Sequence, residues 1–104
     1  MTCAVVEIDG GSCLLTARGH ATGCTEVCAA VSAIIYALSG YVLNAGEHLR
    51  GLERNELRSA WARIECSGDA CLRAAFRMAG IGLAQVAKAY PEQLTVRFTE
   101  EGGE

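Results

Sequence analysis

A histidine and a cysteine lie eight residues apart in the first third of the chain, within the segments Gly19-His20-Ala21 and Cys28-Ala29-Ala30. An imidazole next to a thiol can remove its proton and hold the charge of the thiolate, which is the attacking species of a cysteine nucleophile. The two residue types at this spacing therefore indicate a Cys/His dyad, with Cys28 as nucleophile and His20 as general base and acid.

The pair falls where a predicted strand gives way to a predicted helix. Residues 3–8 and 13–18 are β-prone runs, and the turn residues 9–12 between them predict a β-hairpin. Apolar residues crowd most faces of residues 26–43, which is typical of a buried helix, and Thr25 is its predicted N-cap. Cys28 then lies in the first helical turn, where unpaired N–H groups and the helix dipole would stabilise a thiolate or an oxyanion.

The second half of the chain predicts the remaining elements. Residues 47–55 are polar enough for a loop or a weak edge strand, and residues 57–66 alternate like a half-exposed strand. Residues 70–90 predict a second helix capped by Ser67 or Asp69, and residues 94–98 predict a final strand after Pro91. The stripe expected to pack the second helix consists of Leu72, Phe76, Ala79, Leu83, Val86 and Ala87.

These elements predict an α/β (α+β) fold: a two-layer sandwich of two helices on a mostly antiparallel sheet, in the order β-β-α-(β)-β-α-β. The length of 104 residues suits one domain, residues 1–104. We expect His48, in a charged segment, to be solvated.

Composition argues against several classes of function. The formal net charge of -3 and the lack of a basic cluster argue against nucleic-acid binding. The apolar stretch 27–43 is interrupted by small polar residues, so we expect a core helix rather than a membrane anchor. The first ten residues do not resemble a signal peptide, which predicts a cytoplasmic protein with reduced cysteines. Of these, Cys3, Cys13 and Cys66 are predicted to be core packing.

Two neighbours of the dyad are open to two interpretations. Ser32 follows Cys28 by one helical turn, so its hydroxyl either reaches the cysteine or bonds back to a backbone carbonyl. Gly19 either adopts a special backbone angle beside the substrate or simply ends a strand. Both are therefore candidates for supporting residues of the site.

The segments Gly19-His20-Ala21 and 28–33 resemble the two signature blocks of the ribosomal-processing cysteine protease family, Prp. The likeness extends over nearly the whole chain, including the segment 89–92 before the last strand. It implies a homodimeric cysteine endopeptidase that removes an N-terminal extension from a bacterial large-subunit ribosomal protein. By this resemblance His20 is the general base and acid, Cys28 is the nucleophile, and Ser32 matches the serine of the cysteine block. It implies no cofactor, no metal and no membrane or nucleic-acid partner.

The chain departs from the family pattern between the two blocks. Family members carry a longer glycine-containing loop and an aspartate three residues before the cysteine, whereas this chain has a short loop and Thr25 at that position. A shorter loop changes how a peptide is held. The identity of the substrate is therefore less constrained than the dyad itself.

Other functions are also compatible with the sequence. A related protease could act on a phage capsid or scaffold precursor, and a non-catalytic paralogue could keep the fold as an interaction subunit. A zinc-binding module is a third alternative, because His20, Cys24 and Cys28 are evenly spaced and either Cys66 or Cys71 would complete four ligands. Cys24 is also the alternative nucleophile on the same loop.

Overall fold

The computed structural model describes residues 1–19 and 24–101 of the chain. Five strands, two α-helices and one short 3-10 helix follow one another within these residues. Their bounds are β1 Thr2–Asp9, β2 Ser12–Arg18, α1 Thr25–Leu43, η1 Gly46–His48, β3 Leu49–Arg58, β4 Trp61–Gly68, α2 Ala70–Ala89 and β5 Leu94–Glu101.

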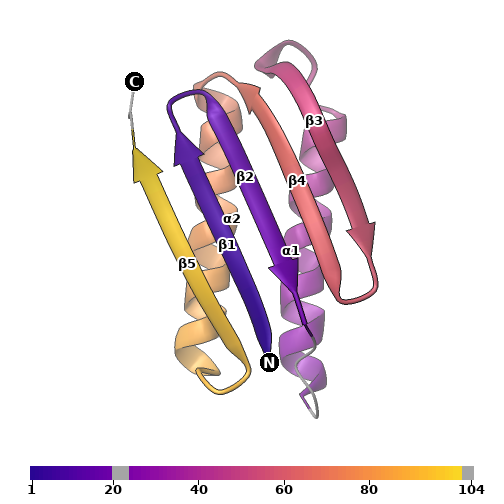
Figure 1. Ribbon diagram of the computed structural model, residues 1–104, viewed down its shortest axis with the longest axis vertical. Helices are drawn as coiled ribbons and strands as arrows, with labels where there is room; N and C mark the ends of the chain where they lie inside the picture. The colour runs from indigo at the N-terminus through magenta and orange to yellow at the C-terminus, as the bar shows by residue number, and fades with distance from the viewer. Residues whose placement is uncertain (20–23, 102–104) are drawn as a thin grey trace.

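The strands form a single sheet in the order β3-β4-β2-β1-β5. β5 runs parallel to β1, and the other three pairings are antiparallel. Both helices cover the same face of the sheet, and the other face is open (Figure 1). The predicted two-layer α+β sandwich and its order of elements are thus confirmed.

The core lies between the sheet and the helix layer because side chains alternate along each central strand. Every second residue of β1, β2 and β4 is buried against the helices, and the residues between them are more exposed. From the helices, apolar residues at helical spacing complete this layer. The largest fully buried side chains include Phe76, Ile8, Leu15, Ile64, Leu72, Leu83 and Leu94.

The hairpin β3–β4 decides one prediction and corrects another. The polar segment 47–55 was predicted to be a loop or a weak edge strand; its residues 49–55 belong to β3 at the edge of the sheet, and residues 47 and 48 belong to η1. The predicted strand 57–66 is divided by a tight turn at Ser59 and Ala60. The alternation of apolar and polar residues continues across this turn. Ala60 adopts a positive φ of 59°, at a position where a turn usually has glycine or asparagine. Composition alone therefore did not reveal the turn.

The N-cap of α2 is the predicted residue, whereas the N-cap of α1 is not. Asp69 is the N-cap of α2, as predicted, and its carboxylate accepts hydrogen bonds from the N–H groups of Cys71 and Leu72. The N-cap of α1 is Cys24 rather than Thr25, which is the first helical residue. The helix therefore begins without the hydroxyl cap that the sequence predicted.

By length and composition α1 is also apolar enough to cross a membrane, the one such helix in the described ranges. Here it packs on the sheet through one face: Val27, Val31, Ile35, Leu38, Ser39 and Val42 are buried. The buried face agrees with the predicted core helix, but the prediction of burial on most faces is wrong, because Tyr36 and Leu43 are exposed.

A polar pair fastens the edge strand to α1. The Ser39 hydroxyl donates to Oδ1 of Asn55 at 2.7 Å, and Nδ2 of Asn55 donates to the Ser39 carbonyl at 3.2 Å. We expect Asn55→Ala to lower the free energy of unfolding by about 1–3 kcal/mol, because it leaves partly buried polar groups of Ser39 without these bonds. Urea denaturation of the two proteins measures the difference.

Asn44→Ala is the matched control for this pair. In the wild type the side-chain amide of Asn44 donates to the backbone carbonyl of Gly40. This position is exposed, so water replaces the bond that the substitution removes. We expect a change below about 0.5 kcal/mol for this control. Equal losses in the two variants would contradict the role assigned to the buried pair.

Cys13 and Cys66 face each other across β2 and β4 and are buried, as predicted, whereas Cys3 is exposed on the open face of the sheet. The prediction that Cys3 packs in the core is therefore wrong. Cys3 shares the alternation of β1 but lies on its open face, and the sequence alone did not fix which face was covered.

Burial raises the pKa of Cys13 from 9.0 to about 11 and that of Cys66 to about 12. At pH 8 the thiolate fraction of Cys13 is then about a hundredfold below that of an ordinary thiol. We expect iodoacetamide to label the exposed Cys3 and Cys71 of the folded, metal-free protein and to spare the buried pair. Peptide mapping by mass spectrometry measures the labelling, and equal labelling of all four would contradict the prediction.

The raised pKa values of Cys13 and Cys66 predict that the folded protein loses stability at alkaline pH. Thiols of the unfolded chain lose their protons above pH 9, while those of the folded protein keep them up to about pH 11 or 12. The buried thiols therefore make their full contribution to the free energy of unfolding below pH 9. That contribution is lost as the pH rises through the pKa values of Cys13 and Cys66 in the folded protein.

Candidate active site

A groove of about 450 Å³ opens between the first half of α1 and the ends of the neighbouring strands. It is walled on one side by the helix and on the other by the turn that joins β3 to β4. Its lining includes Gly19, Cys28, Ser32, Tyr36, Arg58 and Trp61.

Cys28 lies on the wall of this groove, in the N-terminal part of α1, and is half-buried. Its N–H already donates to the carbonyl of Cys24 at 3.3 Å, so it belongs to the helical hydrogen-bond ladder. The N–H groups of residues 25–27 precede that ladder, and the Cys24 side chain does not cap them. The sulfur of Cys24 lies 3.7 Å from Oε1 of Glu26 instead. The start of α1 thus presents backbone donors and the positive end of the helix dipole close to Cys28.

Ser32 also lines the groove, one helical turn after Cys28, and is exposed. The two residues therefore occupy one face of α1, as their spacing predicts. This position favours the interpretation in which Ser32 belongs to the neighbourhood of the thiol.

Gly19 forms the rim of the groove at the end of β2 and has a φ of 99°. Its N–H donates to the Ala60 carbonyl at 3.0 Å, and its own carbonyl accepts from the Thr2 hydroxyl at 3.3 Å. A Cβ at this position would overlap the carbonyl of Met1. Of the two interpretations left open by the sequence, the special backbone angle is the one observed.

The turn between β3 and β4 supplies the opposite wall. The guanidinium of Arg58 stacks over the ring of Trp61 at 4.9 Å from its centroid, and both residues line the groove. Arg58 also pairs with Glu56. Together with Tyr36 from α1, this wall offers apolar surface beside a positive charge, which suits an extended peptide.

The structure brings together three of the four predicted site residues: Gly19, Cys28 and Ser32. His20 lies outside the described residues, so its part in the dyad stays a prediction. The sequence did not predict the contribution of Arg58 and Trp61. These residues are far from Cys28 in the chain, and only the pairing of β2 with β4 brings them to the groove.

The structure argues against the predicted zinc site in which Cys66 or Cys71 would be the fourth ligand. Cys66 is buried toward the end of β4, and Cys71 follows at the start of α2. These positions lie at the opposite end of the sheet from the N-terminus of α1 (Figure 1). Neither cysteine can therefore join Cys24 and Cys28 around one ion.

His48 is also placed differently from the prediction. Instead of being fully solvated it is partly buried, and its Nδ1 lies 2.7 Å from Oδ2 of Asp69. The hydrogen bond that the His48 ring donates to the Asp69 carboxylate is the largest cause that raises the pKa of His48.

Comparison with known proteins gives a clear answer for the fold. No family model matches the sequence, and no curated protein sequence matches it. Among solved structures, the ribosomal-processing protease Prp from S. aureus, in complex with a substrate peptide, superposes with a TM-score of 0.75 at 17% identity, covering 94% of this chain and 99% of that one. The same protease with a covalently linked product peptide gives 0.74.

SMU.848 from Streptococcus mutans also superposes, with a TM-score of 0.74 at 23% identity, covering 96% of this chain and 95% of that one. At these identities the likeness concerns the course of the backbone. Over nearly its whole length, the chain therefore has the fold of the ribosomal-processing protease Prp.

Proposed function

We propose that the protein is a cysteine endopeptidase with Cys28 as its nucleophile. The observation that carries the proposal is the position of Cys28, beside the start of α1 and open to a groove, in a fold shared with a protease whose structures hold peptides. The backbone N–H groups beside Cys28 suit the oxyanion that forms when a thiol attacks a peptide carbonyl.

In the proposed mechanism, Cys28 Sγ attacks the carbonyl carbon of the scissile peptide bond. The N–H groups at the start of α1 donate to the oxyanion of the tetrahedral intermediate. His20 takes the thiol proton and passes it to the leaving amine, which leaves a thioester on Cys28. Water activated by His20 then attacks the thioester, releasing the acid and restoring the thiol.

For the substrate we propose the N-terminal extension of a bacterial large-subunit ribosomal protein, which the sequence resemblance implies. Such an extension is an unfolded peptide, and the groove between α1 and the β3–β4 turn offers apolar and cationic walls to it. The corresponding location is the cytoplasm, where ribosomal proteins are made.

The test is incubation of the purified protein with a synthetic peptide that copies the extension and its junction, followed by mass spectrometry. We expect one cleavage at the junction, which His20→Ala abolishes. A scrambled peptide of the same composition is the control. Cleavage by His20→Ala at the wild-type rate would refute the dyad, and an intact peptide would refute the ribosomal substrate.

We further propose that the protein is a homodimer, as the resemblance implies. Large apolar side chains are exposed on both helices, among them Tyr36 and Leu43 on α1 and Met78 on α2. Apolar surface of this kind is typical of protein interfaces. Light scattering coupled to size-exclusion chromatography should give twice the mass of one chain, and the mass of a single chain would contradict the proposal.

A further inference from the structure

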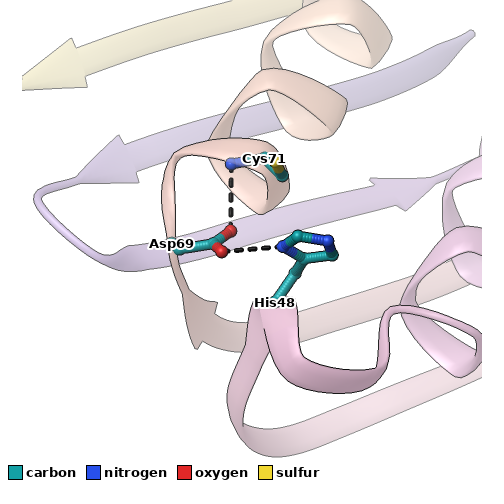
Figure 2. Close-up of side chains that lie close together, drawn as sticks. All are labelled: His48, Asp69 and Cys71. Atoms are coloured by element: carbon teal, nitrogen blue, oxygen red, sulfur yellow. Dashed lines mark hydrogen bonds and ion pairs between the residues drawn. The ribbon is translucent and has the colours of Figure 1, made fainter.

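A second group of reactive side chains lies at the end of the sheet opposite the groove. His48 ends η1, Asp69 caps α2, and Cys71 lies in the first turn of that helix. Figure 2 shows the His48 ring and the Asp69 carboxylate facing each other, with Cys71 beside them. One ligand atom from each of the three lies within 4.8 Å of the other two.

The backbone holds the two segments in this arrangement. The N–H of Asp69 donates to the His48 carbonyl at 3.1 Å, which ties the end of η1 to the start of α2. Oδ1 of Asp69 accepts from the N–H groups of Cys71 and Leu72, so the carboxylate is oriented with Oδ2 toward His48. Hydrogen bonds that exist before any ligand binds therefore set the His48 ring and the Asp69 carboxylate, and fix the backbone that carries Cys71.

The donor set is that of a zinc ion. Imidazole nitrogen, carboxylate oxygen and thiolate sulfur are its usual protein ligands, and three of them leave a fourth tetrahedral position to water. The ionised carboxylate and thiolate carry two negative charges, which exceed the partial positive charge of about one half at a helix N-terminus. These charges balance those of a divalent cation.

We propose that His48, Asp69 and Cys71 bind one Zn²⁺ ion, with water as the fourth ligand. The ion replaces the proton between Nδ1 of His48 and Oδ2 of Asp69, and the Cys71 thiol releases its proton on binding. Nδ1 and Oδ2, now 2.7 Å apart, move to about 3.4 Å from each other, the separation of two atoms about 2.1 Å from a tetrahedral zinc ion. The proposal is independent of the protease function.

The test is titration of the reduced, metal-free protein with Zn²⁺ by calorimetry, and with Co²⁺ by absorption. We expect one ion per chain at this site and a thiolate-to-cobalt charge-transfer band. Cys71→Ser should remove that band and weaken Zn²⁺ binding by at least about a hundredfold. His48→Gln should weaken binding similarly, as should Asp69→Asn, whose amide still caps α2 and keeps the helix start folded.

Two control variants separate this site from other thiols. Cys3→Ser removes an exposed thiol of the open sheet face and should leave binding unchanged. A double variant, Cys24→Ser with Cys28→Ser, should abolish peptide cleavage and leave the ion at His48, Asp69 and Cys71. Binding that survives in Cys71→Ser and disappears in the double variant would overturn the proposal, as would no binding to the wild type.

Zn²⁺ should also raise the thermal midpoint of the wild type, because a ligand that binds the folded state stabilises it. The same addition should raise the midpoint of Cys71→Ser much less, because its affinity for Zn²⁺ is expected to be at least about a hundredfold lower. Equal shifts in both proteins would count against the site.

Discussion

Replacing Cys28 with serine is expected to reduce the rate of peptide cleavage at least about a thousandfold, because a neutral hydroxyl replaces the thiolate that attacks the carbonyl. The groove itself should remain, since serine is close to cysteine in size and Cys28 is half-buried at its wall. We therefore expect kcat to fall while peptide binding is kept. Single-turnover cleavage and fluorescence anisotropy of a labelled peptide measure the two quantities.

Two further variants make this result specific. Cys24→Ser removes the neighbouring thiol at the N-cap and should retain most of the activity. Ser32→Ala, on the same wall as Cys28, should lower the rate less than Cys28→Ser does. If Cys24→Ser loses cleavage while Cys28→Ser keeps it, Cys24 is the nucleophile. If neither affects cleavage, the reaction does not use a thiol of this loop.

Gly68→Ala is expected to lower the free energy of unfolding by about 3 kcal/mol, the upper end of the usual range for overpacking a tight site. A Cβ at this position would overlap the carbonyl oxygen of His48 and lie 2.6 Å from Cδ2 of the buried Leu72. Neither neighbour can move freely, because the His48 carbonyl accepts from Asp69 N–H and the Leu72 side chain is fully buried. The thermal midpoint should fall by at least about 10 °C.

Gly40→Ala is the matched control. Gly40 lies inside α1, and nothing is within 4 Å of the Cβ that alanine would add. Alanine in a helix interior costs less conformational entropy than glycine, so this variant should be about 0.5–1 kcal/mol more stable than the wild type. A loss of stability in Gly40→Ala equal to that in Gly68→Ala would show that the contact with His48 is not the cause.

Most of the fold could be predicted from local patterns. The turn at residues 9–12, the apolar spacing of both helices and the cap at Asp69 each determine a nearby structure, and each prediction was confirmed. The hairpin β3–β4 could not be predicted because its turn uses Ala60 at a positive φ, a conformation imposed by strand pairing rather than by residue type. Polar residues of β3 likewise reflect its edge position, which depends on the whole sheet.

The site was only partly predictable for a related reason. Cys28 and Ser32 are one helical turn apart, and Gly19 ends the preceding strand, so local spacing predicts their proximity. The opposite wall comes from the pairing of Arg18 with Trp61, a long-range register that no local pattern contains. The pairing of His48 with Asp69 was missed for the same reason, since 21 residues separate them.

The parallel pairing of β1 with β5 affects how the chain folds during synthesis. β1 leaves the ribosome well before its partner on one side, residues 94–101, which form the last described strand. Until then β1, β2, β3 and β4 can pair among themselves, but one edge of β1 has no partner and Leu94 is missing from the core. Such an edge invites pairing with other chains. The nascent protein therefore keeps this unpaired edge, and the risk of aggregation that goes with it, until residues 94–101 are available to pair with β1.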